Sequence, residues 1–377
     1  MKIIFTGGGS GGHFYPIIAV AQAINRIANE KHIIKPDLYF FAPAPYNEGI
    51  LYDNGVKYKK TYAGKVRTYF SPLNFFDIFK TAWGTLSALL DVFDVYPDVV
   101  FGKGGFGSFP TLMAARLLRI PVVIHESDTV PGKANKWASK FARRIAISWQ
   151  EAAEHFPKDR VAYTGQPIRR SILNSIVEGA HRFFDMEEGV PTILILGGSL
   201  GAEKLNDAVI DALLQLVNKY QVIHQTGAGN FEAVRKTADA VLLTSVHRGR
   251  YRPYPYLNDL EETMAAGAAQ VILSRAGSTI FEIASWGRAS IIVPITESNG
   301  NHQLKNAFAY ASSGAATVVE ENNLSNNILL SEIGRIVDNP DLRTKMEESA
   351  KNFFKPGADD KIARELLTIA LGHEALD

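Results

Sequence analysis

Short apolar runs alternate with longer amphipathic stretches along most of the chain. Apolar runs that suit buried strands stand in the first half at residues 2–6, 38–42, 99–101, 122–125 and 145–148. Stretches with helical apolar periodicity follow several of them, at residues 17–27, 73–90, 111–118 and 132–141. This alternation predicts βαβ units, in which helices cover a parallel sheet.

The same pattern restarts after Gln166-Pro167. Strands are predicted at 192–196, 222–225, 271–274 and 290–293, and helices at 205–219, 261–266, 278–286 and 303–312. Each half opens with a strand that runs into a glycine-rich turn, at 7–12 and at 197–201. We therefore predict an α/β protein of two Rossmann-like domains whose parallel sheets face across a cleft. The domains are expected at 1–165 and 166–355, and a C-terminal helix in 356–377 can pack back on the N-terminal domain.

Length and composition agree with this architecture and exclude several protein classes. At 377 residues the chain has room for two domains with a core each. Its 40 basic and 39 acidic residues leave a net charge of +1, which argues against a nucleic-acid partner. The absence of cysteine excludes thiolate metal sites and cysteine nucleophiles and suits a reducing cytoplasm. We expect no secretion signal and no membrane-spanning helix, because every apolar stretch is too short or is interrupted by charges.

The first glycine-rich turn is a candidate ligand site. It reads Thr6-Gly7-Gly8-Gly9-Ser10-Gly11-Gly12-His13, and a helix is expected to begin after it, near Pro16. Glycines allow a ligand to approach the backbone, and a helix N-terminus attracts negative charge. His13 stands at the mouth of the turn, where an imidazole can take a proton from an attacking hydroxyl. The alternative is a residue at the helix start that only bonds to the backbone.

Two further segments of the first half are expected near the same sheet edge. His125-Glu126-Ser127-Asp128 follows a predicted strand, and ligands of open α/β sheets bind at the carboxyl ends of strands. His125 or Glu126 is therefore the second choice for the proton acceptor, and ordinary loop polarity is the alternative. Arg169, near the expected domain boundary, can bind a diphosphate with two hydrogen bonds or form an interdomain salt bridge.

The second half carries groups that suit a nucleotide sugar. Ser199 lies in the second glycine-rich turn, where its hydroxyl can donate to a phosphate. Ser278 and Thr279 can cap a helix and also meet a phosphate, while Glu282 can accept two hydrogen bonds from a ribose diol. A structural capping box is the alternative for this block. Gln303 opens a later helix, with an amide suited to sugar hydroxyls or simply to a polar loop.

No spacing of His, Asp or Glu indicates a metal site, and there is no G-x-x-x-x-G-K-[ST] phosphate loop. We therefore expect neither a metal nor another cofactor. Without a family resemblance, the two halves suit a sugar transferase, a nucleotide-sugar epimerase or a binding module. A nicotinamide dehydrogenase is less favoured, because no acidic residue is well placed on a second strand end after Gly12.

The motifs together resemble the MurG family of bacterial undecaprenyl-diphospho-muramoylpentapeptide N-acetylglucosaminyltransferases, over nearly the whole chain. The resemblance rests on Gly8-Gly9-Ser10-Gly11-Gly12-His13, 102–107, His125-Glu126, Asn135-Lys136, 165–169, 197–202, 274–282 and Asn301-His302-Gln303. It implies a GT-B fold and inverting, metal-independent transfer of N-acetylglucosamine from its UDP donor to the muramoyl 4-hydroxyl of lipid I, which gives lipid II. Another GT-B transferase is the nearest alternative.

The resemblance also implies a role for individual residues. Ser10, Gly11 and Gly12 would lie near the reacting sugar and diphosphate, with His13 as the base. Arg169 and Ser199 would contact the donor phosphates, the backbone of Leu257 would read uracil, and Gln303 would hold the donor sugar. The diphosphate would bind at Ser278, Thr279, Ile280 and Phe281, and the ribose at Glu282.

Three positions depart from the family pattern. Asp128 stands where the family usually has an Asn that contacts the donor sugar, and Phe106 replaces a frequent Tyr near the acceptor. The loop 276–279 is one residue shorter than usual. We expect the chemistry to survive all three.

The lipid acceptor implies a peripheral position on the inner face of the cytoplasmic membrane. Residues 57–79 mix lysines and an arginine with aromatic residues, which suits anionic headgroups and an interfacial apolar face. The alternative is a loop followed by a helix that faces the core.

Overall fold

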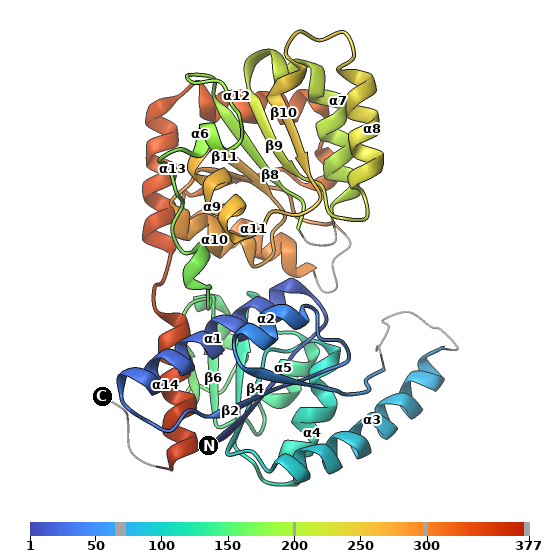
Figure 1. Cartoon of the computed structure of the whole chain (residues 1–377), viewed down its shortest axis with the longest axis vertical. Coiled ribbons are helices and arrows are strands. Elements are labelled where there is room, and N and C mark those ends of the chain that lie inside the picture. Colours follow the sequence, from blue (N-terminus) through green and yellow to red (C-terminus); the bar gives the residue numbers. More distant parts are fainter. Residues whose placement is uncertain (65–72, 199–200, 297–300, 373–377) are drawn as a thin grey trace. The chain divides into compact units, whose positions relative to one another are not determined.

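The computed structural model describes residues 1–64, 73–198, 201–296 and 301–372, with the backbone alone for 73–80. The chain forms two compact units (Figure 1). Unit 1 consists of Met1–Arg169 and Lys355–Asp377, and unit 2 of Arg170–Phe354.

Unit 1 is built on a seven-stranded parallel sheet in the order β3-β2-β1-β4-β5-β6-β7. Its strands are β1 (Lys2–Thr6), β2 (Asp37–Ala42), β3 (Val56–Lys60), β4 (Val99–Gly102), β5 (Val122–Glu126), β6 (Arg144–Ile147) and β7 (Val161–Tyr163). The sequence prediction left out β3 and β7. Both are edge strands, whose partly solvated positions carry no continuous apolar run.

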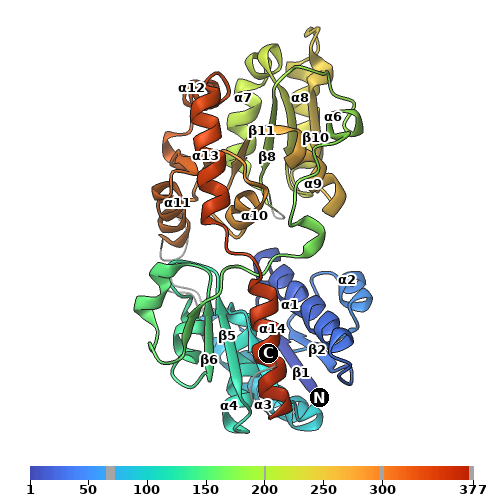
Figure 2. The same ribbon diagram turned by 90° about the vertical axis from the view of Figure 1, so that its left-hand side faces the viewer.

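The helices of unit 1 come from both ends of the chain. They are α1 (Gly11–Glu30), α2 (Glu48–Asp53), α3 (Leu73–Val95), α4 (Phe109–Leu117), α5 (Lys133–Ala138) and α14 (Ala358–Leu371), with 3-10 turns at Phe106–Ser108 and Gln150–His155. Helix α14 lies beside α1 (Figure 2), and its Ile362 and Leu366 share one core with Ile3 and Phe5 of β1. An ion pair between Arg26 and Asp360 also joins the two helices.

Unit 2 repeats the architecture with a six-stranded parallel sheet in the order β10-β9-β8-β11-β12-β13. Its strands are β8 (Thr192–Leu196), β9 (Gln221–Gln225), β10 (Tyr251–Tyr254), β11 (Ala269–Ser274), β12 (Ser290–Ile292) and β13 (Ala316–Val318). The sequence prediction again left out the two edge strands, β10 and β13. The prediction of two Rossmann-like domains with parallel sheets is confirmed.

The sheet of unit 2 is covered by a further set of helices. They are α6 (Ala180–Phe183), α7 (Glu203–Lys219), α8 (Phe231–Val241), α9 (Asp259–Ala268), α10 (Thr279–Trp286), α11 (His302–Ser312), α12 (Asn326–Val337) and α13 (Pro340–Phe353), with 3-10 turns at Arg170–Ile172, Arg248–Arg250 and Glu321–Asn323. Ile193 and Ile195 of β8 pack against Leu205 and Val209 of α7 and Ile333 of α12. Strand β8 ends at Leu196, directly before the second glycine-rich turn.

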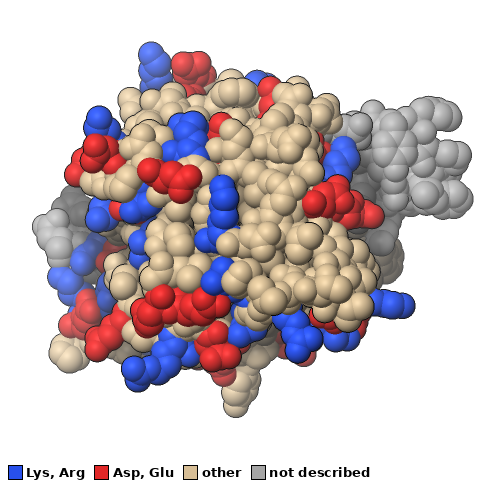
Figure 3. Space-filling view, turned by 90° about the horizontal axis from the view of Figure 1, so that it is seen from above, with Lys and Arg blue, Asp and Glu red and all other residues tan. Residues whose placement is uncertain are grey.

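Among the described helices, none is both long and apolar enough to cross a membrane. On the face of the molecule shown in Figure 3, basic and acidic side chains are interspersed. That distribution agrees with the net charge of +1.

Candidate active site

The first glycine-rich turn connects β1 to α1, and the helix begins earlier than predicted. Ser10 is the N-cap residue and α1 starts at Gly11, not near Pro16. The amide groups of His13 and Phe14 both donate to the carbonyl of Ser10, at 3.0 Å. Glycine is tolerated here because a first helical turn has few intrahelical hydrogen bonds to lose. Gly11, Gly12 and His13 therefore belong to the first turn of the helix, whose N-terminus attracts negative charge.

The His13 side chain is held between two glycine segments. Its Nδ1 lies 2.8 Å from the hydroxyl oxygen of Ser10. Gly105 has a φ of +79°, and a Cβ there would lie 2.8 Å from Gly8 Cα and 3.4 Å from His13 Nε2. A side chain at Gly105 would therefore force the two turns apart, so glycine makes room for the imidazole.

The environment of His13 keeps its imidazole neutral at neutral pH. Burial and, after it, the charge of the Lys103 ammonium lower the pKa of His13 to about 4, while the Asp128 carboxylate opposes the change. When Nδ1–H donates to the Ser10 hydroxyl, the lone pair of Nε2 is available to accept a proton. A neutral imidazole with an unprotonated Nε2 can act as a general base, and that role of His13 stays a prediction.

Glu126 stands at the end of β5, and four hydrogen bonds surround its buried carboxylate. Oε1 accepts from the amides of Ser127 and Asp128 at 2.8 and 3.1 Å. Oε2 accepts from the amide of Gly132 and from Asn135 Nδ2, both at 3.0 Å. Burial, followed by the charge of Asp128, raises the pKa of Glu126. Both oxygens are committed to shaping the loop after β5. Asn135 was not predicted as a site residue, although it lies within one of the motifs of the family resemblance.

His125 is fully buried and joins two parts of unit 1. Its Nε2 lies 3.2 Å from the carbonyl of Gly165 and 3.1 Å from Ser148 Oγ. Since a carbonyl only accepts, Nε2 carries the proton of this bond. Burial holds the pKa of His125 well below its ordinary value. This geometry ties β5 to the loop after β7 and favours His13 over His125 as a base.

Arg169 and Asp128 lie in the same unit. The guanidinium of Arg169 is buried and lies 3.9 Å from the ring centre of Tyr15 on α1, a cation–π contact. The side chain of Asp128 is partly exposed, and its amide is held by Glu126. Binding of donor phosphates by Arg169 and of the donor sugar by Asp128 stays a prediction.

In unit 2, β11 leads into a short loop and then into α10. Ser278 is the N-cap residue, and its side chain makes no capping hydrogen bond. The interpretation of this block as a capping box is therefore wrong; the described capping box is that of Asn258 and Glu261 at the start of α9. Thr279 is the first helical residue, and Glu282 lies in the first turn of α10. This helix N-terminus stands at the carboxyl edge of the sheet, where open α/β sheets bind ligands.

The next residues of α10 face the interior of unit 2. Ile280 is fully buried, and Phe281 stacks on Phe353 with ring centres 5.9 Å apart. Their side chains are core residues and do not meet a phosphate. The amide of Ile280 donates to the carbonyl of Gly277 at 3.2 Å and that of Phe281 to the carbonyl of Ser278 at 3.0 Å, so what these two residues offer a phosphate is the positive end of the helix dipole.

The remaining predicted donor contacts have partners within unit 2. The amide of Leu257 donates to Gln225 Oε1 at 3.2 Å, and Leu257 is fully buried. Gln303 Oε1 accepts from the amide of Ile295 at 3.1 Å, which orients the side-chain amide. Ser199 lies outside the described residues.

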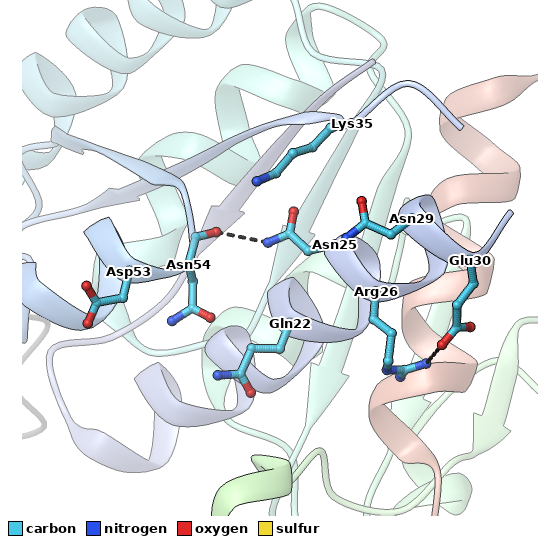
Figure 4. Close-up of a pocket in the computed structure, with 8 residues that line it drawn as sticks. All are labelled: Gln22, Asn25, Arg26, Asn29, Glu30, Lys35, Asp53 and Asn54. Carbon is cyan, nitrogen blue, oxygen red and sulfur yellow. Dashed lines mark hydrogen bonds and ion pairs between the residues drawn. The ribbon is translucent and has the colours of Figure 1, made fainter. Parts of the chain in front are cut away.

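A pocket of about 460 Å³ opens on another part of unit 1 (Figure 4). It is lined by Gln22, Asn25 and Asn29 of α1 together with Lys35 and Asn54, which precede β2 and β3. Segments that precede strands lie at the amino edge of a parallel sheet, opposite the edge that carries His13. Ligands of such sheets bind at the carboxyl edge, so we expect the active site at the edge that carries His13 and not in this pocket.

Comparison with known proteins agrees with this arrangement. Residues 3–147 match the glycosyltransferase family 28 N-terminal domain, and residues 192–361 match the glycosyltransferase family 28 C-terminal domain. A relative from Thermodesulfovibrio yellowstonii, named UDP-N-acetylglucosamine–N-acetylmuramyl-(pentapeptide) pyrophosphoryl-undecaprenol N-acetylglucosamine transferase, is 35% identical over 374 residues. The match covers 96% of this chain and 97% of the relative.

Two solved structures are similar over nearly their whole length. The crystal structure of Acinetobacter baumannii MurG is 25% identical, with a TM-score of 0.71, and the match covers 97% of this chain and 99% of that one. A UDP-GlcNAc 2-epimerase from Neisseria meningitidis, bound to UDP-GlcNAc, is 15% identical, with a TM-score of 0.68 and coverage of 98% and 100%. The epimerase shares the fold alone. By its full-length relatives and its two family 28 domains, the chain belongs to the MurG family of GT-B glycosyltransferases.

Proposed function

We propose that this chain transfers N-acetylglucosamine from UDP-N-acetylglucosamine to the 4-hydroxyl of the muramoyl sugar of lipid I and so forms lipid II. The observation that carries this conclusion is the similarity at 35% identity, over 96% of the chain, to a transferase named for this donor and this acceptor class. Matches of this length include both domains, so they cover the candidate sites of both sheets.

The backbone fold by itself does not favour a transferase over an epimerase. The TM-scores of the MurG structure and of the Neisseria epimerase are 0.71 and 0.68. Sequence identity separates them, at 25% and 15%. Since one fold hosts several reactions, the residues at the sheet edges decide the function.

Unit 1 is assigned the acceptor and the proton transfer. The N-terminus of α1, with Ser10, Gly11 and Gly12, favours negative charge of the substrates. Nε2 of His13 takes the proton from the 4-hydroxyl while that oxygen forms a bond to C1 of the donor sugar. The bond from C1 to the diphosphate breaks on the opposite face, and UDP leaves with the electron pair, so the configuration at C1 inverts.

Unit 2 is assigned the UDP-sugar. The N-terminus of α10, from Ser278 to Phe281, would hold the diphosphate, because the helix dipole stabilises its charge without a metal. Glu282 would accept from the ribose hydroxyls, and Gln303 would hold the sugar. The backbone of Leu257 and the hydroxyl of Ser199 in unit 2, together with the guanidinium of Arg169 in unit 1, complete the proposed donor contacts.

The lipid acceptor places the enzyme on the inner face of the cytoplasmic membrane. In support, Trp83, Leu86, Leu90 and Phe93 of α3 are each more than half exposed. Their spacing of three and four residues puts them on one face of the helix. Of the basic residues predicted to meet headgroups, Lys59 is paired with Asp91 at 2.8 Å, and Lys60 is the last residue of β3. The side chains of residues 65–80 lie outside the described ones.

The transfer is tested with labelled UDP-N-acetylglucosamine, with and without a lipid I analogue, in the presence of EDTA. We expect a labelled disaccharide lipid only when the acceptor is present, and none from UDP-N-acetylgalactosamine. An epimerised nucleotide sugar formed without the acceptor would contradict the proposal and favour an epimerase.

Membrane contact is tested by sedimentation with liposomes that contain phosphatidylglycerol. Replacement of Trp83 and Leu90 by Ser is expected to lower the liposome-binding constant at least about a hundredfold, because burial of each large apolar side chain contributes roughly 1.5–3 kcal/mol. The matched control replaces Leu243 and Val246 of unit 2, which are 74% and 90% exposed, by Ser. Equal binding of the two variants would contradict the role of α3.

A further inference from the structure

Unit 1 contains a buried lysine that the proposed function does not use. Lys103 follows β4 and is 2% exposed. Its amide donates to the carbonyl of Thr6 at 2.8 Å, which fixes it beside the end of β1. Its ammonium donates to Ser127 Oγ at 2.5 Å. A buried ammonium is costly unless hydrogen bonds and opposite charges stabilise it, so its presence beside the candidate base needs a reason.

A chain of hydrogen bonds holds this ammonium in place. Ser127 Oγ donates to Gln166 Oε1 at 2.7 Å, and Ser148 Oγ donates to the same oxygen at 2.7 Å. Ser148 Oγ in turn lies 3.1 Å from Nε2 of His125. The chain connects the ends of β4, β5 and β6 with the loop after β7. Because every member is partly or fully buried, the position of the Lys103 charge relative to the loops is defined.

The charges around His13 come from two turns. Lys103 lies in the turn after β4, where Lys103 Cβ and His13 Cβ stand 3.5 and 3.6 Å from the place that a Cβ at Gly7 would take, so both side chains flank Gly7. Asp128 lies in the loop after β5, and the two charges act on His13 in opposite directions. Burial lowers the pKa of Lys103, Glu126 and Asp128 oppose this change, and the resulting pKa is about 8. The ammonium is therefore mostly charged at neutral pH. Of these groups, Lys103 alone brings positive charge to His13.

We propose that Lys103 is a positioning residue for the transfer: its ammonium holds the turn at Ser127 and Asp128 in place and keeps the His13 imidazole free of a proton until the acceptor hydroxyl supplies one. Asp128 acts in the opposite sense and stabilises the imidazolium that forms when the proton is taken. Lys103 thus lowers the basicity of His13 and Asp128 raises it, and the balance of the two charges sets how readily the imidazole takes a proton. This inference rests on the proposed function and on His13 as the proton acceptor.

Two kinds of variant change the charge at this point. Lys103→Met removes the ammonium and keeps an unbranched side chain of similar length. Ser127→Asp leaves Lys103 in place and puts a carboxylate at its hydrogen-bond partner. Ser127→Asn is the matched control, because Asp and Asn differ in charge and little in shape. If Lys103→Met does not fold, the comparison at Ser127 still decides the question.

The direct measurement is the titration of His13 by NMR in the full chain, with its signal assigned by its loss in a His13→Gln variant. We expect the pKa of His13 to rise by about one unit in Lys103→Met and in Ser127→Asp, as an interaction of one to two kcal/mol between nearby charges implies. The acid limb of the pH profile of kcat should move upward by the same amount. Ser127→Asn should leave both at their wild-type values.

The proposal is overturned if Ser127→Asp titrates like the wild type, or if Ser127→Asn shifts the titration as much as Ser127→Asp does. The first result would show that charge at this point does not reach His13, and the second that shape matters and charge does not. A failure of the proposed function has a different signature. In that case the wild-type protein binds UDP and forms no transfer product, whatever the His13 titration shows.

Discussion

The two units share a parallel sheet covered by helices, yet the carboxyl edges of their sheets carry different chemistry. In unit 1 this edge brings together His13, Lys103, Glu126 and Asp128. Burial and the charges of their neighbours shift the pKa values of His13, Lys103 and Glu126. In unit 2 this edge carries the start of α10, with the hydroxyls of Ser278 and Thr279, and the side-chain amide of Gln303 on α11. The charged groups Arg275 and Lys204 both pair with Glu321, at 2.5 and 3.2 Å.

This difference teaches that one architecture has been used for two tasks. Interacting titratable groups around a partly exposed imidazole suit a site that moves a proton. A helix N-terminus with neutral donors suits a site that holds a diphosphate without reacting. Unit 1 should therefore control the rate of the reaction, and unit 2 should control the affinity for the donor. Variants on the two edges should separate these quantities.

The largest effect is expected from His13→Ala. Loss of the general base should lower kcat by roughly 10²–10⁴-fold, while UDP binding, measured by titration calorimetry, should stay within twofold of wild type. A loss of UDP affinity as large as the loss of kcat would show that the two tasks are not divided between the units.

Glu282→Ala should produce the opposite pattern. A hydrogen bond to a charged group contributes about 1.5–3 kcal/mol, so the KM for the UDP-sugar should rise about 10- to 100-fold. The kcat at saturating donor should change little, because the ribose is bound equally in the ground state and the transition state. Steady-state kinetics at several donor concentrations measure both quantities. A fall in kcat with an unchanged KM would break the comparison.

Elements of the fold could be predicted from the sequence where neighbouring residues determine them, and could not where the determining contacts are distant in the chain. The central strands were predicted because strands buried on both faces read as apolar runs. The edge strand β3 escaped, since its sequence Val-Lys-Tyr-Lys-Lys is mostly polar. The start of α1 was misplaced because Pro16 looked like a helix start, although it lies inside the helix.

The candidate site divides in the same way. The turn that carries His13 was recognisable, because glycines, a histidine and a helix start are adjacent in the sequence. The role of Lys103 was not, because Ser127 and Gln166 come from other loops and the burial of a lysine leaves no local trace. Glu126 was predicted as a possible base for its chemistry, and only its four hydrogen bonds reveal its structural task.

A smaller effect concerns stability in acid. His224 in unit 2 is fully buried, with Nδ1 2.9 Å from the Tyr251 hydroxyl and Nε2 3.0 Å from Asn206 Oδ1. Burial lowers the pKa of His224 to about 3. The unfolded chain therefore binds a proton below about pH 6.5 that the folded unit does not bind, and stability falls as pH decreases.

This linkage should cost about 2 kcal/mol of unfolding free energy at pH 5 relative to pH 7. In His224→Gln the decrease should be smaller by that amount, even though the variant is less stable at neutral pH. Melting curves of the two proteins between pH 5 and pH 7.5 measure the difference in slope. Parallel slopes would mean that His224 becomes protonated without unfolding, contrary to its burial.

The smallest effect compares two helix starts within unit 2. Asn258 caps α9 in a reciprocal capping box, whereas the hydroxyl of Ser278 makes no capping bond at α10. Asn258→Ala should therefore cost about 1 kcal/mol of stability and leave the KM for the donor unchanged. Ser278→Ala should leave the melting temperature unchanged and raise that KM about three- to tenfold, as loss of one hydrogen bond to a phosphate implies. If Ser278→Ala instead lowers the melting temperature as Asn258→Ala does, the start of α10 is a structural cap, and the division of tasks between the units loses its support on the donor side.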